Sequence, residues 1–340
     1  MNRQWVISDE RDFAMNIHRA ESVMLRHFGL GGDGFLAEVL SGLRKPQKEL
    51  PTKYLYDERG SRLFEHICAL DEYYIPRTEA SIMQAHIEEM VELIGSCALL
   101  VEYGSGNCRK VRSLLDNLRD PVAYLPVDIS REQLAHVARD LALDYPALEV
   151  LPVCADYMSD FTLPKPQRDF NQVVVYFPGS TIGNFSPIAA EQFLRHIAAV
   201  CGSGGALLIG IDLKKDDNVL HRAYNDSEGV TAAFNLNLLQ RINHELEGDF
   251  QIDWFEHCAF YNRDEGRVEM HLVSRREQDV HLDNTTIHFA EGETIWTESS
   301  YKFDLGEFAQ LAASAGFKVQ QVWTDERRWF SVEYLMATGK

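Results

Sequence analysis

The stretch LLVEYGSG at residues 99–106 indicates the fold of this chain more clearly than any other segment. Its first part is mostly apolar, which is typical of a strand buried on both faces, and it ends in a glycine turn. A helix-length amphipathic segment, Arg109 to Leu118, follows. A strand, a glycine turn and a helix in this order predict a parallel α/β sheet, whose ligands bind beyond the carboxyl ends of its strands.

The same alternation of strand and helix continues to about residue 213. Four more strands are expected in AYLPVDIS (123–130), LEVLPVCAD (148–156), VVVYFPGS (173–180) and ALLIGIDL (206–213), with helices at 131–145, where Ser130 is the expected N-cap, and at 186–200. Near the C-terminus a helix at 305–317 precedes a hairpin of strands 318–325 and 329–337. An antiparallel hairpin after a parallel sheet predicts the seven-stranded, Rossmann-like α/β sheet of class I methyltransferases.

Two further segments do not follow this alternation. Residues 1–75 read as helical and aromatic, and residues 214–301 combine a helix, AAFNLNLLQRINHEL, with several strands. We therefore expect a methyltransferase domain of residues 76–213 plus 302–340. A second, α+β domain of residues 1–75 plus 214–301 is expected to bind the substrate and to cover the strand ends as a lid.

Composition restricts the partners of this 340-residue chain. The formal net charge is −19 and no Lys/Arg-rich run is present, so nucleic acid is not an expected partner. No segment has the roughly 18 consecutive apolar residues of a membrane span, and the N-terminus lacks an apolar signal segment, which favours the cytoplasm. The six cysteines form no C-x-x-C pair, so no metal site is expected. A monomer is the default expectation, because no coiled-coil pattern appears.

The residues after the first three strands suggest a cofactor site. The third glycine of a dinucleotide fingerprint would fall at position 109, which is Arg, so a nicotinamide cofactor is disfavoured. Asp128 ends the second strand, where an acid can hold ribose hydroxyls, and Asp156 with Tyr157 follows the third strand, where adenine would lie. A glycine turn is often only a turn, and single acids often only cap helices. The pattern alone therefore leaves both a methyl-donor site and a purely structural interpretation open.

Several longer motifs resemble one known family, the ergothioneine-pathway histidine Nα-methyltransferases, which trimethylate histidine to hercynine. The resemblance covers nearly the whole chain. Its markers are YLYDERGSRLFEHI (54–67), EYYIPRTEA (72–80), VEYGSGNCRK (101–110), VDIS (127–130), FPGSTIGNF (177–185), AYNDSEGVTAAFNLN (223–237) and TESSYKF (297–303). The departures are Asn107-Cys108-Arg109 after the glycine turn, where the family has Thr-Ser-Glu, and Pro178 before the GSTIGN segment.

The resemblance implies S-adenosyl-L-methionine as the co-substrate and L-histidine as the methyl acceptor. It implies donor contacts from the glycine turn and from residues on the neighbouring loops, namely Gly104, Ser105, Gly106, Lys110, Asp128, Asp156, Tyr157 and Gly179. Tyr73, Asn184 and Tyr224 would hold the amino and carboxylate groups of the amino acid, and Tyr73 and Asn184 would position the amine for catalysis without a dedicated base. Tyr56, Phe64 and Met270 would line the pocket.

Glu298 and Ser300 would bind the imidazole ring. They are two residues apart in a strand-like segment, so both face one side and suit a ring with two nitrogens. Without the resemblance, a solvent-facing polar pair explains them as well. Likewise Asn184 can cap the next helix, and each tyrosine can fill the core.

Three other functions stay open at this stage. A methyltransferase of the same architecture could act on a tryptophan derivative, although Glu298 with Ser300 suits an imidazole better than an indole. A donor-binding regulatory protein without turnover would not need the amino-acid motifs. A nicotinamide oxidoreductase is opposed by Arg109.

Overall fold

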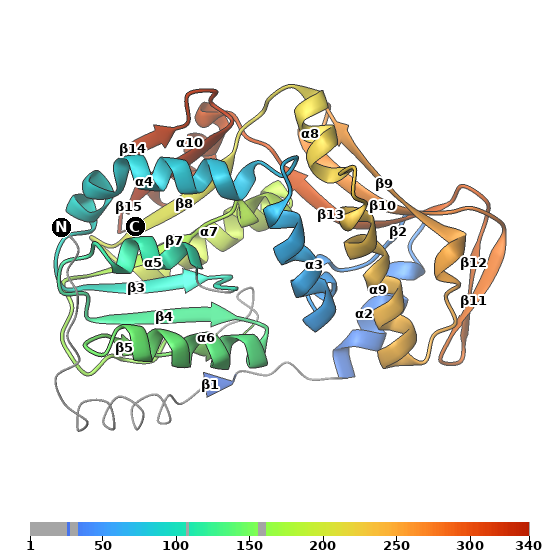
Figure 1. Ribbon diagram of the computed structural model, residues 1–340, viewed down its shortest axis with the longest axis horizontal. Coiled ribbons are helices and arrows are strands. Elements are labelled where there is room, and N and C mark those ends of the chain that lie inside the picture. Colours follow the sequence, from blue (N-terminus) through green and yellow to red (C-terminus); the bar gives the residue numbers. More distant parts are fainter. Residues whose placement is uncertain (1–25, 28–32, 107–108, 156–160, 340) are drawn as a thin grey trace.

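The computed structural model describes residues 26–27, 33–106, 109–155 and 161–339. Its larger sheet has nine strands, whose order is β1-β6-β4-β3-β7-β8-β15-β14, with β5 paired to β4 (Figure 1). The strands are β1 (Arg26–His27), β3 (Ala98–Tyr103), β4 (Ala123–Asp128), β5 (Glu149–Val150), β6 (Val153–Cys154), β7 (Gln172–Phe177), β8 (Ala206–Asp212), β14 (Phe317–Thr324) and β15 (Phe330–Ala337).

This topology confirms the predicted class I methyltransferase sheet. Along the order β1-β6-β4-β3-β7-β8 all neighbouring strands pair in parallel. Strand β15 lies between β8 and β14 and is antiparallel to both. The strand count exceeds the predicted seven for two reasons. The third predicted strand is divided into β5 and β6 around Pro152, which has no N–H to donate, and the short strand β1 adds to the sheet edge beside β6.

Helices cover both faces of the larger sheet. On one face, α4 (Ile75–Ile94), α5 (Arg109–Leu115) and α6 (Arg131–Asp144) belong to one apolar cluster; on the other, α7 (Pro187–Cys201) and α10 (Leu305–Ser314) belong to a second. Alternate residues of β8 enter the two clusters, with Leu208 in the first and Leu207 and Ile209 in the second. The continuous apolar runs of the sequence therefore reflect burial on both faces.

The smaller sheet has the order β2-β13-β10-β9 and is accompanied by a two-stranded hairpin, β11-β12. Its strands are β2 (Lys48–Glu49), β9 (Phe255–Asn262), β10 (Arg267–Ser274) and β13 (Thr294–Tyr301), and the hairpin is formed by β11 (Gln278–Leu282) and β12 (Thr285–Phe289). The surrounding helices are α2 (Asp33–Leu43), η1 (Thr52–Leu55), α3 (Glu58–Ala69), α8 (Asp217–Tyr224), α9 (Val230–Leu246) and η3 (Ile252–Trp254).

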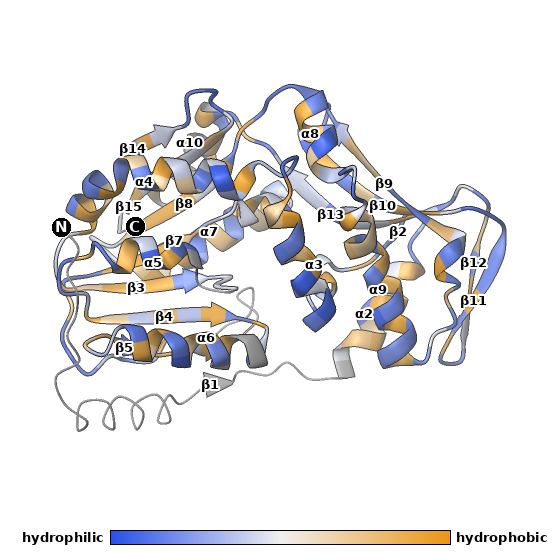
Figure 2. Ribbon diagram, viewed as in Figure 1, coloured by the Kyte–Doolittle hydropathy of each residue, from blue (hydrophilic) through white to orange (hydrophobic). Residues whose placement is uncertain are grey.

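The two sheets share a core. The apolar cluster on the α4 face of the larger sheet continues through Leu55, Phe234 and Leu238 to the strands of the smaller sheet. Apolar residues colour most of β3 and β8 in the larger sheet, whereas the β11-β12 hairpin is mostly hydrophilic (Figure 2). The carboxyl ends of β3 and β4 point toward α3 (Figure 1). Ligands of such sheets bind at this edge, which here faces the helices that surround the smaller sheet.

A short 3₁₀ helix, η2 (Thr181–Asn184), connects the two parts. It follows β7 and packs against β13, where a side chain at Gly183 would lie 2.7 Å from the carbonyl oxygen of Tyr301. Glycine permits this close approach. Among the described residues, no helix is both long and apolar enough to cross a membrane.

Candidate active site

The glycine turn after β3 forms an open cradle. Gly104 and Gly106 have positive φ angles of 70° and 50°, which glycine adopts without strain. A Cβ atom built on either glycine meets no atom of the described residues within 4 Å, which leaves room for a ligand against this part of the turn. Ser105, between them, is buried, and among the described residues its Oγ has no hydrogen-bond partner. An orphan hydroxyl beside open backbone is the pattern expected where a ligand supplies the missing partner.

Asp128 ties the second strand to this turn. Its Oδ2 accepts a hydrogen bond from the Gly106 N–H at 2.9 Å, and its Oδ1 accepts from the Ser130 N–H at 3.0 Å. Ser130 occupies the predicted N-cap position of α6, but its side chain makes no capping hydrogen bond. Burial raises the pKa of Asp128, although these backbone donors favour the ionised form. The carboxylate is thus fixed at the strand end where an acid suits ribose hydroxyls.

A buried acid on α4 contacts two more of the residues that were predicted to bind the methyl donor. Glu79 is 1% exposed; its Oε1 accepts from the Gly179 N–H at 2.7 Å, and its Oε2 pairs with Lys110 Nζ at 2.6 Å. Gly210 lies so close that a Cβ there would be 2.2 Å from Glu79 Oε1. Lys110 and Gly179 therefore lie together at the sheet edge as predicted. Asp156 and Tyr157, the expected adenine contacts, lie outside the described residues.

A second buried acid lies in the last part of β3. The hydroxyl of Tyr124 donates to Glu102, which is 1% exposed. Burial raises the pKa of Glu102 to about 8, against the lowering effects of Tyr124 and Lys110. Glu102 is therefore mostly protonated at neutral pH. It adds little negative charge beside Asp128.

Predicted substrate residues from distant segments form one aromatic cluster, which also contains Phe234 of α9. The ring centroids of Tyr56 and Phe64 lie 5.5 Å apart, those of Phe64 and Tyr73 6.3 Å apart, and those of Tyr73 and Tyr224 6.1 Å apart. Phe234 lies 5.5 Å from Tyr56 and 6.0 Å from Phe64. Burial raises the pKa of both Tyr73 and Tyr224, so their phenols stay protonated.

Glu298 and Ser300 lie in β13, on one side of the strand as predicted. Met270 of β10 is opposite Glu298 in the ladder, so its side chain lies on the same face. Glu298 is 9% exposed, and among the described residues its buried Oε2 has no hydrogen-bond partner. Burial raises the pKa of Glu298 to about 7, while Lys302 lowers it. An orphan carboxylate oxygen in a buried position requires a partner, which a ligand N–H would provide.

A buried ionic network supports this face. Lys302 is fully buried, and its Nζ pairs with Asp212 Oδ2 at 2.8 Å. Asp212 also accepts from the Tyr74 hydroxyl and pairs with Lys215. Burial opposes ionisation of Asp212, yet the two lysines hold its pKa below its usual value. The network joins the carboxyl end of β8 to the end of β13.

Asn184 ends η2 and is half-buried. It does not cap the next helix, because the Ser186 hydroxyl accepts from the Ala189 N–H at the start of α7. The alternative capping role considered for Asn184 is therefore wrong. Because η2 packs on β13, it brings Asn184 to the strand that carries Glu298 and Ser300.

Several residues of these clusters were not among the predicted site residues, among them Glu79, Phe234 and Lys302. Each of these three lies within a marker motif, in EYYIPRTEA, AYNDSEGVTAAFNLN and TESSYKF respectively. Glu79 carries a signal that pattern analysis can use, since it lies on the buried face of α4 together with Ile75, Ile82 and Met83. A lone acid on an apolar helix face indicates a specific buried partner.

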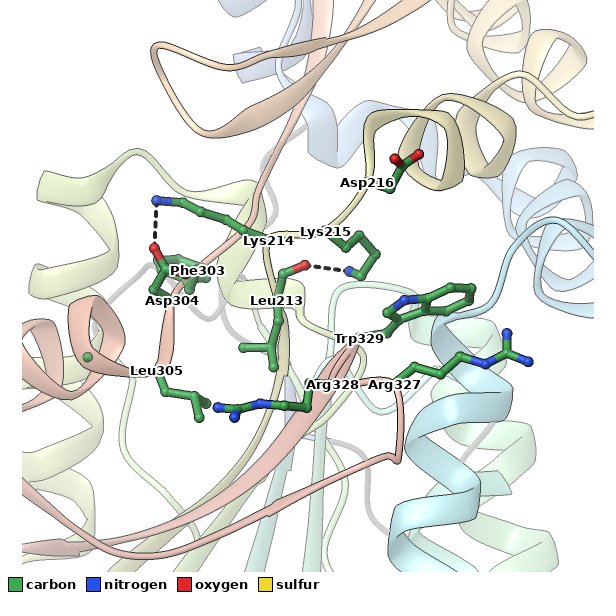
Figure 3. Close-up of a pocket in the computed structure, with 11 residues that line it drawn as sticks. Leu213, Lys214, Lys215, Asp216, Phe303, Asp304, Leu305, Arg327, Arg328 and Trp329 are labelled. Atoms are coloured by element: carbon green, nitrogen blue, oxygen red, sulfur yellow. Dashed lines mark hydrogen bonds and ion pairs between the residues drawn. The ribbon is translucent and has the colours of Figure 1, made fainter.

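Two cavities lie outside this candidate site. One of about 630 Å³ is lined by residues 213–216, 303–306 and 327–329. In it, Lys214 pairs with Asp304, and the side chains of Arg327 and Arg328 point in opposite directions (Figure 3). A second, of about 270 Å³, shares Arg327 and Trp329 with the first. None of the predicted site residues lines either cavity, so the candidate site is identified by its orphan polar atoms and its aromatic cluster.

Comparison with known proteins identifies the family. The model of histidine-specific, S-adenosylmethionine-dependent methyltransferases matches residues 35–337. The chain is 40% identical over 294 residues to the histidine N-alpha-methyltransferase of Mycolicibacterium smegmatis, covering 85% of this chain and 90% of that protein. It is 41% identical over 307 residues to the enzyme of the same name from Mycobacterium tuberculosis, covering 87% and 94%.

A fungal relative is longer than this chain. Ergothioneine biosynthesis protein 1 of Neurospora crassa is 33% identical over 285 residues, which are 82% of this chain and 32% of that protein. The match to the family model spans the glycine turn, the aromatic cluster and the Glu298–Ser300 pair together. The chain belongs to the histidine-specific, S-adenosylmethionine-dependent methyltransferase family.

Proposed function

We propose that this chain transfers methyl groups from S-adenosylmethionine to the α-amino group of L-histidine, three in succession, to give hercynine. The observation that carries the proposal is the buried Oε2 of Glu298, which has no partner among the described residues and lies on the strand face that also presents Ser300. A neutral imidazole has one N–H for the carboxylate and one free nitrogen for the hydroxyl. The names of the mycobacterial relatives support the same substrate.

On the donor side, the open turn at Gly104, Ser105 and Gly106 and the fixed carboxylate of Asp128 fit an adenosine bearing a short charged chain. Lys110 and the Gly179 backbone, both held by Glu79, would contribute to the same site. Asp156 and Tyr157, outside the described residues, stay the adenine contacts that the sequence suggests. When bound, S-adenosylmethionine supplies a methyl group on a sulfonium. The residues of the chain contribute orientation rather than acid catalysis.

On the acceptor side, Tyr73, Asn184 and Tyr224 would orient the amine and carboxylate of histidine. An α-amino group has a pKa near 8, so the site must select or generate the neutral amine. Burial keeps the phenol of Tyr73 protonated, which suits it to orient the amine through hydrogen bonding and not to act as a phenolate base. Correct positioning of the lone pair accounts for most of the rate.

The division of labour follows the two sheets. We assign donor binding to residues 76–213 plus 302–340 and acceptor binding to residues 1–75 plus 214–301, with one adjustment, because β1 joins the larger sheet. We also propose that the enzyme acts as a monomer in the cytoplasm on free amino acid, without nucleic-acid or membrane partners. The strongly negative charge of −19 supports the exclusion of nucleic acid.

The second candidate acceptor is a tryptophan derivative. An indole has one N–H and no free ring nitrogen, so it would satisfy Glu298 but leave the hydroxyl proton of Ser300 without an acceptor. The depth of the pair, with Glu298 at 9% and Ser300 at 5% exposure, makes an unsatisfied hydroxyl costly. This favours histidine.

Mass spectrometry of the reaction products tests the proposal. Purified protein and S-adenosylmethionine are incubated in parallel with histidine, tryptophan and the α-N-methylated histidines. We expect a gain of three methyl groups on histidine and none on tryptophan. Glu298→Ala removes the acceptor for the ring N–H and is expected to raise KM for histidine roughly 10- to 100-fold, the effect of one hydrogen bond to a charged group.

Glu277→Ala is the matched control, because Glu277 is an exposed glutamate whose side chain is 78% accessible. It should leave KM unchanged. Methylation of tryptophan with none of histidine would replace the proposed acceptor by the second candidate. Binding of S-adenosylmethionine without any methylated product would retain the fold and exclude the proposed reaction.

A further inference from the structure

Lys302 is buried beside two hydroxyls, that of Ser300 in the proposed imidazole site and that of Tyr224, and each of its three protons is donated to a neighbouring oxygen. Its Nζ donates to Asp212 Oδ2 at 2.8 Å, to Tyr224 Oη at 2.9 Å and to Ser300 Oγ at 2.7 Å. An ammonium group has three donors and no acceptor, so the direction of each of these hydrogen bonds is fixed. Tyr224 and Ser300 must both act as acceptors toward it.

The remaining hydrogen bond within this group joins the two hydroxyls. Tyr224 Oη lies 2.8 Å from Ser300 Oγ and donates to it. The phenol is the more acidic of the two hydroxyls and therefore the better donor. Ser300 Oγ then accepts two hydrogen bonds, one from Lys302 and one from Tyr224. Its own proton is the one polar hydrogen of the triad left for a ligand.

Glu298 offers a hydrogen-bond acceptor to the substrate, whereas Ser300 offers a donor. It lies two residues before Ser300 on the same face of β13, and its Oε2 is buried without a partner among the described residues. In its ionised form a carboxylate only accepts. The face of β13 therefore presents one donor, at Ser300, and one acceptor, at Glu298.

We propose that Lys302 is a specificity-determining positioning residue: by donating one hydrogen bond each to Ser300 and Tyr224, it leaves Ser300 to accept from Tyr224 and to donate to the substrate, and so selects a ring with one N–H and one unprotonated nitrogen. Lys302 itself does not touch the substrate. This inference rests on the proposed binding of histidine. It adds the polarity of the site, which the identities of Glu298 and Ser300 alone leave undefined, because a serine hydroxyl can donate or accept.

The first test is a double-mutant cycle. Lys302→Met keeps the chain length without donors, and Ser300→Ala removes the hydroxyl. Each single variant is expected to weaken histidine binding about tenfold or more, measured by calorimetry in the presence of S-adenosylhomocysteine. Because Lys302 acts through Ser300, the second substitution should add little. The affinity of the double variant for histidine should lie within about twofold of that of the single variant that binds histidine less tightly. Losses that multiply instead would overturn the inference.

Lys302→Gln tests the hydrogen bonds apart from the charge. A carboxamide retains two N–H donors, so we expect it to recover part of the affinity that Lys302→Met loses. Lys214→Met is the matched control, since Lys214 is a partly exposed lysine paired with Asp304 and Glu307, and it should bind histidine normally. Equal losses in Lys302→Met and Lys302→Gln would contradict a role through donated hydrogen bonds.

A second measurement does not depend on a Lys302 variant that folds. The two pyrrolylalanines, which carry their N–H at one or the other ring position, have no free ring nitrogen to accept from Ser300. Ser300→Ala should therefore lower the affinity for histidine about tenfold. Its affinity for the pyrrolylalanine that binds more tightly should stay within about twofold of that of the unaltered protein.

Equal weakening of histidine and that analogue by Ser300→Ala would overturn the donor assignment. The proposed function fails by a different outcome, namely unaltered protein that neither binds nor methylates histidine, which overturns the inference with it. If the unaltered protein binds histidine but the losses in the double-mutant cycle multiply, the inference about Lys302 is overturned and the proposed function is retained.

Discussion

Tyr56 illustrates what a single ring in the aromatic cluster offers to the later methyl transfers. After the third transfer the nitrogen is a quaternary ammonium, which cannot donate a hydrogen bond but is attracted to an aromatic face by about 0.5–2 kcal/mol. Tyr56 packs edge-on against both Phe64 and Phe234, so its ring is held in place by its neighbours. The contribution of this ring should grow with each methyl group added.

Tyr56→Ala is therefore expected to shift the products toward mono- and dimethylhistidine, with the third transfer slowed about threefold or more relative to the first. Time courses of the three products by mass spectrometry measure this. Tyr56→Phe keeps the ring and should preserve the product ratio. An unchanged ratio in Tyr56→Ala would rule out a cation-binding role for this residue.

Helix α4 connects the donor site to the core through Glu79. Glu79→Gln keeps an acceptor for the Gly179 N–H but removes the negative charge that holds Lys110. We expect S-adenosylhomocysteine to bind roughly 10-fold more weakly and the free energy of unfolding to fall by about 1–3 kcal/mol, because Glu79 is 1% exposed. Calorimetric titration and denaturant unfolding measure the two effects.

Glu88→Gln is the control for α4, since Glu88 is an exposed glutamate of the same helix. It should change neither quantity. If Glu79→Gln lowered stability but left the affinity for S-adenosylhomocysteine unchanged, Glu79 would have a structural role alone, and Lys110 would not depend on it for its position.

The strands and helices also show where sequence patterns succeed. The buried runs that became β3, β4, β7 and β8 were predicted because continuous apolar residues are the signature of two-sided burial. The third strand was the exception, since Pro152 interrupts its ladder and leaves only β5 and β6. Ser130 was predicted as a capping side chain, but Asp128 accepts from the Ser130 N–H instead. A local pattern does not reveal such competition between neighbouring side chains.

The chain as a whole should unfold in one step. One apolar cluster extends from the larger sheet through α3 and α9 to the smaller sheet, so neither part has a separate core on that side. We expect a single thermal transition with equal calorimetric and van't Hoff enthalpies. Two resolved transitions in differential scanning calorimetry would contradict a shared core.

The stability of the whole chain should also depend on pH through its buried acids. Burial raises the pKa of Glu102 to about 8 and of Glu298 and Glu333 to about 7, from an ordinary value of 4.5. Between these values the folded chain keeps protons that the unfolded chain releases. The stabilisation is therefore complete below pH 4.5 and is lost as the pH rises through 7 to 8.

Glu102→Gln removes one of these titrations and keeps an acceptor for the Tyr124 hydroxyl. Its free energy of unfolding should fall less steeply with pH than that of the unaltered chain, by at most about 1.4 kcal/mol per pH unit. Guanidinium unfolding at several pH values between 5 and 8 measures the difference. Parallel curves for the two proteins would mean that Glu102 is ionised in the folded state.

The amino-acid sequence alone was enough to predict the larger sheet and its closing hairpin, because periodic burial is a local property of the sequence; the ligand contacts it suggests stay a prediction. It could not predict which polar atoms are satisfied. Contacts between segments far apart in the chain decide that Ser300 accepts from Tyr224, that Glu79 accepts from the Gly179 N–H, and that Oε2 of Glu298 has no partner in the part of the chain that the structure describes. Tertiary packing decides these properties, because a hydrogen-bond direction depends on every donor and acceptor that the fold brings together.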